Sequence, residues 1–387
     1  MAPESAARPI PILLMSHSLG HGGGERQLAL TALNIDRNRF EPHVGCCEGG
    51  FWVDRLGAAG VPFFRMGPRS LVGISALREA RRLRAYIREH GIRIVQSFDY
   101  TMNVLGIPAA RSVPGVITIS NQRCHMSLIP RRYRWLNQFA HRISAGIVVN
   151  SEALRRHLAE DYSIPPQKIF TCYNGIDTAV FHPAPRAELP GLEGAALKEA
   201  ELVIGTVCVL RSEKNLGLLL DAFETVARNR PGIRLLIAGS GPEEAVLRAR
   251  AARLNIESKC VFQPSTPDVA RTLSAIDVFV LPSLSEGLSN ALMEAMACGC
   301  CVIASAVGGL PELVTEGTTG LLFPSRNKDA LTARLSEVLD DAPRRQALGA
   351  AAAERMCREF SLAHAVEKMQ EIYEAMLSRR PLLAKVG

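Results

Sequence analysis

The chain has 387 residues, of which 47% are apolar and 21% are charged, and its formal net charge is +7. This length predicts two or three domains, and the composition is typical of a protein with a packed core. It excludes collagen-like repeats, coiled coils and a disordered chain. No apolar run reaches the roughly 18 residues of a membrane-spanning helix, and residues 1–10 do not resemble a secretory signal.

Short apolar runs alternate with helix-like segments through the first half of the chain. The first run, Ile10–Ser16, ends in a glycine-rich turn before a predicted helix at Glu25–Asn34. Further strands are predicted at Pro42–Cys47, Pro62–Met66, Ile92–Ser97, Gly115–Ile119, Gly146–Asn150 and Lys168–Cys172. Ser75–His90 is the clearest of the other helices. Apolar strands that alternate with helices predict a parallel sheet covered on both faces.

A proline- and glycine-rich stretch, residues 183–201, interrupts this pattern and is interpreted as a linker. Strands are then predicted at Leu202–Leu210, Ile233–Ala238, Cys260–Phe262, Asp277–Leu281, Cys301–Ala304 and Gly320–Phe323. Helices are predicted at Leu216–Arg228, Glu243–Leu254, Val269–Ser274, Ala291–Ala297 and over most of Asp329–Leu377. The fold class is α/β, with two doubly wound Rossmann-like domains, residues 1–182 and 202–360, facing a central cleft. Ligands of such sheets bind beyond the carboxyl ends of the strands, so we expect the site in that cleft.

The charge balance and the cysteines restrict the partners. The 45 basic against 38 acidic residues favour anionic partners. Aromatic residues make up only 5% and do not alternate with basic ones, so nucleic acid is not expected. The 10 cysteines form no pair of C-x-x-C motifs, and we expect reduced thiols in a cytoplasmic protein. The group Cys298, Cys300 and Cys301 is interpreted as apolar packing rather than a metal site.

Three loops that follow predicted strands carry candidate binding residues. The glycine-rich loop at residues 20–25 suits an anion at a helix N-terminus, although a tight turn is the alternative and Glu25 replaces the third glycine of a dinucleotide fingerprint. Arg211 and Lys214, three residues apart, can converge on a phosphate or can lie in a solvated loop. The third loop contains Glu286 and leads into an apolar helix that contains Glu294.

Glu294 is the most informative of these residues, because a carboxylate among Leu, Met and Ala is costly to bury unless it accepts hydrogen bonds. Sugar hydroxyls would supply such bonds. The alternative places Glu294 on an exposed stripe of the helix. The backbone N–H groups of Leu288, Ser289 and Asn290 begin the same helix and can hold a phosphate.

The stretch Ala275–Pro324 closely resembles the retaining glycosyltransferases of family 4, which have the GT-B fold. Glu286 and Glu294 match the family's E-x7-E motif, and a Gly-Gly-x-Pro-Glu motif follows them. Other matching motifs occur in order along the chain, at residues 22–25, 149–152, 174–177, 211–215 and 238–242. The resemblance therefore covers nearly the whole chain, and it implies that the C-terminal helix, residues 361–387, packs back towards the first domain.

The resemblance also implies residue roles. It assigns catalytic roles to Glu286, Arg211 and Lys214, with the two cations neutralising a diphosphate leaving group and Glu286 near the reacting carbon of the donor sugar. It assigns ribose binding to Glu294 and further donor contacts to Gly23, Gly24, Gly239, Gly241, Leu288, Ser289 and Asn290. The sequence contains no D-x-D triplet, which agrees with transfer that needs no metal or other cofactor.

Two departures from the family concern catalysis and the acceptor. Many relatives have arginine in place of Val209, and many have histidine where this chain has Ser120-Asn121-Gln122-Arg123. Asn121, Arg123 and His125 are therefore the acceptor-side candidates. Another feature is the cationic and aromatic segment that contains Arg131, Arg132, Arg134 and Trp135. It predicts either peripheral contact with an anionic membrane or a solvated helix face.

Together these features predict a hexosyltransferase that moves a sugar from a UDP-sugar or a GDP-sugar, such as GDP-mannose, to a glycan or lipid-linked acceptor. Cell-envelope polysaccharide assembly at the inner face of the membrane is the expected setting. The rival functions are an epimerase or phosphorylase on the same fold, a nicotinamide dehydrogenase, and a non-catalytic partner that binds a nucleotide-sugar.

Overall fold

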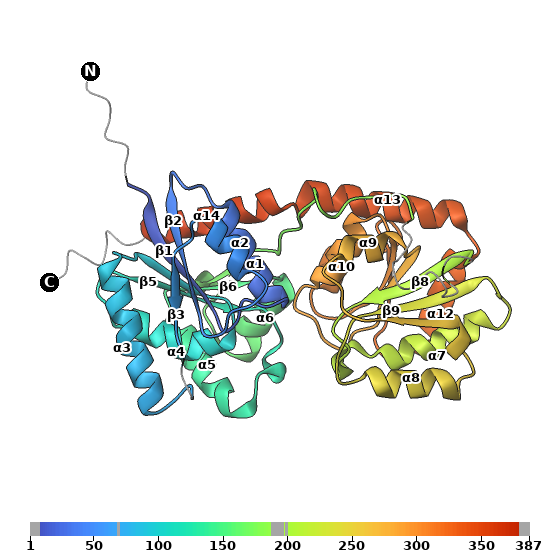
Figure 1. Ribbon diagram of the computed structural model, residues 1–387, viewed down its shortest axis with the longest axis horizontal. Coiled ribbons are helices and arrows are strands. Elements are labelled where there is room, and N and C mark those ends of the chain that lie inside the picture. Colours follow the sequence, from blue (N-terminus) through green and yellow to red (C-terminus); the bar gives the residue numbers. More distant parts are fainter. Residues whose placement is uncertain (1–7, 68–69, 187–196, 198–199, 379–387) are drawn as a thin grey trace, which may run out of the picture. The chain divides into compact units, whose positions relative to one another are not determined.

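The computed structural model describes residues 8–67, 70–186, 197 and 200–378, and it divides into two compact units (Figure 1). Unit 1 comprises residues 1–175 and 362–387, and unit 2 comprises residues 176–361. The division falls earlier than the predicted residue 182, because the N–H of Ile176 donates to Phe360 O at 2.9 Å and Ile176 also pairs with Ser361. Residues 187–196, 198 and 199 of the predicted linker lie outside the described part.

Unit 1 is built on a seven-stranded parallel sheet of order β3-β2-β1-β4-β5-β6-β7. Its strands are β1 (Ile10–Ser16), β2 (Phe40–Cys46), β3 (Phe63–Arg65), β4 (Ile94–Ser97), β5 (Ile117–Gln122), β6 (Gly146–Val149) and β7 (Ile169–Thr171). Its helices are α1 (Gly23–Asn34), α2 (Val53–Ala58), α3 (Ile74–Glu89), α4 (Tyr100–Arg111), α5 (Arg131–Ile143), α6 (Glu152–Asp161) and α14 (Leu362–Ser378).

Alternate residues of the central strand β1 pack against opposite layers of helices. Ile12 and Leu14 belong to one cluster with residues of α1, α2 and α14. Leu13 and Met15 belong to another cluster with residues of α3 and α4. Figure 1 shows the same arrangement, with these two groups of helices on opposite faces of the sheet. A strand that is buried on both faces must be apolar throughout, which is why Ile10–Ser16 was recognisable in the sequence.

Unit 2 is built on a six-stranded parallel sheet of order β10-β9-β8-β11-β12-β13. Its strands are β8 (Leu202–Val207), β9 (Ile233–Ala238), β10 (Cys260–Gln263), β11 (Val278–Leu281), β12 (Cys301–Ser305) and β13 (Leu321–Phe323). Its helices are α7 (Leu216–Ala227), α8 (Glu244–Arg253), α9 (Val269–Ser274), α10 (Asn290–Ala297), α11 (Leu310–Leu313), α12 (Lys328–Leu339) and α13 (Ala342–Glu359). Both units thus have the predicted doubly wound α/β architecture.

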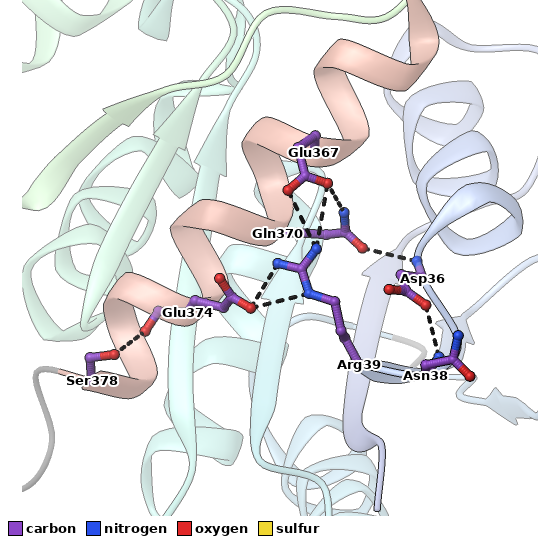
Figure 2. Close-up of polar contacts among 7 residues, drawn as sticks. All are labelled: Asp36, Asn38, Arg39, Glu367, Gln370, Glu374 and Ser378. Atoms are coloured by element: carbon purple, nitrogen blue, oxygen red, sulfur yellow. Dashed lines mark hydrogen bonds and ion pairs between the residues drawn. The ribbon is translucent and has the colours of Figure 1, made fainter. Parts of the chain in front are cut away.

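The C-terminal helix α14 completes the core of unit 1. The buried ring of Tyr373 meets Phe40 edge to face at 5.5 Å, and its hydroxyl donates to Gln96 Oε1. Figure 2 shows further contacts of α14, where the Arg39 guanidinium lies between Glu367 and Glu374. The N–H of Asp36 also donates to Gln370 Oε1 at 2.9 Å. Buried and surface contacts therefore both hold α14 on the sheet.

We expect the buried contact to stabilise this attachment more than the surface ion pairs do. Tyr373→Phe removes a donor from the buried Gln96 side chain and should lower the free energy of unfolding by about 1–3 kcal/mol. Arg39→Ala removes ion pairs to half-exposed carboxylates, which are worth about 1 kcal/mol or less. Urea unfolding of both variants measures the difference, and a larger loss for Arg39→Ala would show that the surface cluster dominates.

Candidate active site

The loops that follow β8 and β9 in unit 2 approach each other backbone to backbone. A Cβ atom at Gly239, where φ is +142°, would lie 1.9 Å from Cys208 O, and one at Gly241 would lie 2.4 Å from Leu210 O. The N–H of Leu210 donates to Ser240 O at 3.0 Å. Glycine is therefore required at both positions, and the close approach fixes the backbone that leads to Arg211 and Lys214. It also explains why β8 ends at Val207 rather than at the predicted Leu210.

The structure brings two of the predicted catalytic residues together. Lys214 Nζ lies 2.6 Å from Glu286 Oε1, and their side chains are only 18% and 11% exposed. The hydroxyl of Ser283 donates to the same carboxylate oxygen at 2.8 Å. The loops themselves are joined because the N–H of Leu284 donates to Glu213 O at 2.8 Å. A cation and a carboxylate are thus held in fixed positions beyond the carboxyl end of the sheet.

The charge of Lys214 is set by two opposing effects. Burial disfavours the charged amine, but the neighbouring Glu286 carboxylate more than compensates, so the pKa of Lys214 lies above its ordinary value. Lys214 is therefore a cation at neutral pH. The third predicted catalytic residue, Arg211, does not share this environment, because its side chain is 62% exposed and lies 3.9 Å from Glu213.

Helix α10 begins where the Glu286 loop ends. Ser289 is its N-cap residue, accepts a hydrogen bond from the N–H of Leu292, and is buried together with Leu288. Glu294 is 5% exposed, so the alternative that placed it on an exposed stripe is wrong. Asn290, the first residue of α10, is partly exposed. Glu286 and Glu294 therefore lie at the two ends of one loop-and-helix segment, one beside Lys214 and the other buried.

The glycine-rich loop of unit 1 leads directly into helix α1, which begins at Gly23, before the predicted Glu25. Gly22 is the N-cap residue and offers no side-chain cap, while the Glu25 carboxylate accepts a hydrogen bond from Ser18 Oγ at 2.9 Å. A Cβ at Gly24 would lie 3.4 Å from Phe98 O and 3.8 Å from Arg123 Cδ. The loop therefore places Gly23 and Gly24 at a helix N-terminus beside a cation.

The three acceptor-side candidates lie in three different environments. Asn121 is in the core of unit 1 and accepts a hydrogen bond from Gln96 Nε2 at 3.0 Å, a position that favours a structural role. Arg123 lies 4.8 Å above the Phe98 ring and donates to Asn174 Oδ1 at 2.8 Å. Burial lowers the pKa of Arg123 to about 10. Arg123 is thus the acceptor-side candidate that lies beside Gly24 of the glycine-rich loop.

His125 lies at the start of a short 3₁₀ turn, Met126–Leu128, where its Nδ1 is 2.8 Å from Ser127 Oγ. Its ring stacks on His157 with the centroids 3.9 Å apart, and burial lowers the pKa of His125. His157 in turn lies 2.6 Å from Asp161. His125 therefore packs with residues of α6. This contact does not assign it the role of the histidine that many relatives have in place of residues 120–123.

A buried histidine that the sequence pattern did not indicate, His141 of α5, contacts the polar end of β5. His141 Nδ1 is 2.8 Å from Ser120 Oγ, and His141 Nε2 is 3.0 Å from Gln122 Oε1. Asn137, one turn earlier on α5, bonds to the same glutamine at 3.1 Å. The spacing of Asn137 and His141 on one face of a helix was a signal for this cluster, but its partners on β5 were not recognisable without the sheet.

We expect acid to destabilise the protein through His141. Burial lowers its pKa to about 3, from an ordinary value of 6.5. Below pH 6.5 the unfolded chain binds a proton here and the folded chain does not, so stability falls as the pH drops towards 3, by up to about 1.4 kcal/mol per pH unit. Urea unfolding between about pH 7 and pH 5 should show a weaker pH dependence for His141→Gln. Equal slopes for the wild-type protein and His141→Gln would contradict this role.

The three neighbouring cysteines have the buried positions that apolar packing predicts. Cys298, Cys300 and Cys301 are buried, and burial raises the pKa of Cys298 and Cys301 to about 12 and that of Cys300 well above its ordinary value. All three are free thiols. They therefore pack as small apolar side chains. Among the described residues, no group of three or more His, Cys, Asp or Glu side chains is arranged to hold a metal ion.

Two family descriptions match successive parts of the chain. Residues 21–180 match Glycosyltransferase Family 4, and residues 193–355 match Glycosyl transferases group 1. Among curated relatives, the α-maltose-1-phosphate synthase of Mycolicibacterium smegmatis is 31% identical over 62% of this chain and 65% of its own length. The D-inositol 3-phosphate glycosyltransferase of Segniliparus rotundus is 29% identical over 70% of this chain and 62% of its own length.

A third relative is the GDP-mannose-dependent monoacylated α-(1-6)-phosphatidylinositol monomannoside mannosyltransferase of Corynebacterium glutamicum. It is 30% identical over 64% of this chain and 67% of its own length. The chain thus spans about two thirds of the length of this third relative. It spans slightly less than two thirds of the length of the first two.

Solved structures with low sequence identity share the fold. The Anabaena protein HepE, in complex with UDP and glucose, has a TM-score of 0.83 and 19% identity, with 94% of this chain and 99% of that chain covered. Sucrose-phosphate synthase from Thermosynechococcus elongatus has a TM-score of 0.80 and 18% identity, with 96% and 100% covered. With the matched motifs and the two parallel-sheet units, these findings show that the chain belongs to glycosyltransferase family 4 and has the GT-B fold.

Proposed function

We propose that this glycosyltransferase transfers a sugar from a UDP- or GDP-sugar to a glycan or lipid-linked acceptor in cell-envelope polysaccharide assembly, with retention of configuration and without a metal ion. The observation that carries the proposal is the Lys214–Glu286 pair, held 2.6 Å apart at the start of the segment that buries Glu294. This arrangement offers a fixed cation, a carboxylate and a second, buried carboxylate to one elongated, anionic ligand.

Lys214 would stabilise the nucleoside diphosphate as it leaves. Negative charge increases on the diphosphate when the glycosidic bond breaks, and a cation that is already in position needs no reorganisation to stabilise it. Positive charge develops at the reacting carbon of the sugar, and the Glu286 carboxylate would stabilise that charge. Arg211 is exposed and would contribute a second cation from the same turn of chain.

Glu294 and the start of α10 would bind the nucleotide part of the donor. Carboxylates pair well with the two hydroxyls of a ribose, because a carboxylate oxygen can accept several hydrogen bonds. The N-terminal end of α10, at Leu288, Ser289 and Asn290, would attract phosphate oxygens. Gly239 and Gly241 would allow the backbone of unit 2 to approach the donor closely.

The names of related proteins support the donor and acceptor classes. The mannosyltransferase of Corynebacterium glutamicum is GDP-mannose-dependent and its name specifies a phosphatidylinositol monomannoside, whereas HepE was solved with UDP and glucose. A nucleotide-sugar donor and a glycan or lipid acceptor agree with these names. We therefore propose UDP and GDP as the two alternative nucleotides of the donor.

We also propose peripheral contact with the inner face of the membrane through α5. Trp135 is 67% exposed and stacks on Phe139 one turn later, while Arg131 and Arg132 are exposed on the same helix. Arg134 contributes less, because its guanidinium donates to Ile129 O and Ser127 O. No helix in the part of the chain that the structure describes is long and apolar enough to cross a membrane.

Sedimentation with vesicles tests this contact. The protein should sediment with phosphatidylglycerol vesicles and not with phosphatidylcholine vesicles, because cationic and aromatic side chains together favour an anionic interface. The variant Arg131→Ala/Arg132→Ala/Trp135→Ala should remain in solution with both. If the wild-type protein also stays in solution, the segment is a solvated helix face.

Proton NMR of reactions with UDP- and GDP-sugars tests the catalytic proposal, with EDTA present and glycosides or extracted glycolipids as acceptors. A glycosyltransferase releases nucleoside diphosphate in proportion to product, and the anomeric coupling of the first product shows whether configuration is retained. An epimerase would convert the donor without releasing nucleoside diphosphate, and a phosphorylase would release a sugar phosphate from a glycan. A non-catalytic partner would bind the donor and leave it intact.

A further inference from the structure

We propose that the exposed rings of His21 and Phe51, at the carboxyl edge of the unit 1 sheet, form a stacking site for a saccharide ring of the acceptor. The proposal rests on the transferase function argued above and adds the chemistry by which unit 1 would recognise its acceptor. The two rings are in contact, with centroids 4.5 Å apart and an interplanar angle of 36°, and each is exposed to solvent.

The loops that carry the rings are fixed to each other. They follow the adjacent parallel strands β1 and β2, whose last residues, Ser16 and Cys46, are paired in register. The N–H groups of Cys47 and Glu48 both donate to His17 O, at 3.0 and 2.8 Å. Further along, the N–H of Trp52 donates to Leu19 O at 3.1 Å. The rings therefore lie on a backbone that is hydrogen-bonded across both loops.

Gly50 allows this contact, because a Cβ atom there would lie 2.5 Å from Leu19 O, and its φ of +157° is accessible to glycine. A side chain at this position would force the two loops apart. The close approach of the loops thus depends on one residue without a side chain, immediately before Phe51.

Phe51 is presented to solvent although its neighbour is buried. Trp52 is 6% exposed and belongs to the core of unit 1, whereas Phe51 is 43% exposed. The Phe51 ring meets Trp52 edge to face at 5.2 Å and His21 at 4.5 Å, so its orientation is fixed on two sides. An exposed aromatic ring with a fixed orientation loses little conformational entropy when a ligand stacks on it.

A sugar site needs hydrogen-bonding groups as well as an aromatic ring, and the same two loops carry such polar side chains. His17 and Glu48 are both exposed, and His17 Nε2 lies 3.6 Å from Glu48 Oε1. The backbone of His17 is held from the other side as well, because its N–H donates to Asp99 Oδ2 at 2.5 Å. An imidazole and a carboxylate on the loops that carry the rings can exchange hydrogen bonds with the hydroxyl groups around the edge of a pyranose.

A saccharide fits this combination because one face of a pyranose presents C–H bonds and its edge presents hydroxyls. The C–H hydrogens carry partial positive charge and are attracted to the negative face of an aromatic ring. Binding sites for small molecules typically combine such an apolar surface with a few polar groups that fix orientation. Arg55 and Arg65 border the same loops, over Trp52 and beside Cys46, so a phosphorylated sugar is the rival ligand.

Saturation-transfer difference NMR with the methyl α-glycosides of glucose, mannose and galactose tests the site on the whole protein. We expect saturation of the ring C–H protons of at least one glycoside. Phe51→Ala should weaken its binding by about tenfold, the scale of one aromatic stacking contact, and Phe51→Trp should retain it. Val246→Ala, which shortens an exposed apolar side chain on α8, should bind like the wild-type protein.

The outcomes separate this site from the donor proposal. UDP and GDP titrations of Phe51→Ala should give wild-type affinities, because the nucleotide contacts argued above, Lys214, Glu294 and the start of α10, lie in unit 2. The saccharide site is contradicted if Phe51→Ala binds the glycosides as the wild-type protein does, if no glycoside shows saturation, or if only sugar phosphates bind. If the glycosides bind through Phe51 and no nucleotide binds, the stacking site stands and the transferase proposal fails.

Discussion

Lys214→Met is expected to weaken the binding of UDP or GDP by about 1.5–3 kcal/mol, the scale of a hydrogen bond to a charged group. The substitution keeps most of the apolar stem and removes the ammonium that lies beside Glu286. The loss should be large because the remaining Glu286 carboxylate, 11% exposed, would then repel the diphosphate without a compensating cation. Titration calorimetry with the wild-type protein and the variant measures the difference.

Lys259→Met is the matched control, since Lys259 is another lysine of unit 2 and donates to Ala227 O at 2.6 Å, away from the Glu286 loop. This variant should bind nucleotides with wild-type affinity. Wild-type affinity of Lys214→Met for both nucleotides would remove Lys214 from the donor site and leave its pair with Glu286 as a structural contact.

Gly308→Ala is expected to lower the free energy of unfolding by about 2–5 kcal/mol, the sum of a left-handed backbone cost and a steric overlap. Gly308 has φ of +53°, and a Cβ atom there would lie 1.9 Å from the carbonyl oxygen of Glu286. Backbone must move on one side or the other, and movement of Glu286 would separate it from Lys214. We therefore expect loss of transfer activity at temperatures where the variant is still folded.

Gly317→Ala separates the two contributions, because Gly317 also has positive φ, +72°, but a Cβ atom there meets nothing within 4 Å. It should cost only about 1–2 kcal/mol, the conformational part alone, and leave activity unchanged. Thermal or urea unfolding with a transfer assay measures both variants. If they unfold at the same midpoint, the overlap at Glu286 is relieved without cost and Gly308 does not support the site.

Much of the fold was predictable because strands buried on both faces are apolar throughout. Ile10–Ser16 and Ile233–Ala238 were predicted with their observed ends for this reason. The errors occur where polar residues are buried or where backbone contacts end an element. β5 runs on to Gln122 because Ser120, Asn121 and Gln122 are buried in polar contacts of the core, which the sequence pattern alone does not indicate.

The candidate site was predictable in its residues and less so in its arrangement. The apolar residues around Glu294 made its burial one of two alternatives, and the structure excludes the exposed one. The contact between Lys214 and Glu286 depends on two strand ends that are distant in sequence, so it required the sheet order. The same reason explains why the His21–Phe51 surface and the His141 cluster were not predicted, since each joins loops or elements whose adjacency is set by the tertiary structure.

Thermal unfolding with UDP, GDP, ADP and their common sugar conjugates, in EDTA, tests the central claim most directly. Ligands that bind only the folded state raise its stability by mass action. The account predicts that UDP or GDP and its conjugates raise the wild-type midpoint by at least about 2 °C, and that Lys214→Met shows a smaller shift. No shift with any of these nucleotides would contradict a donor site at Lys214, Glu286 and Glu294.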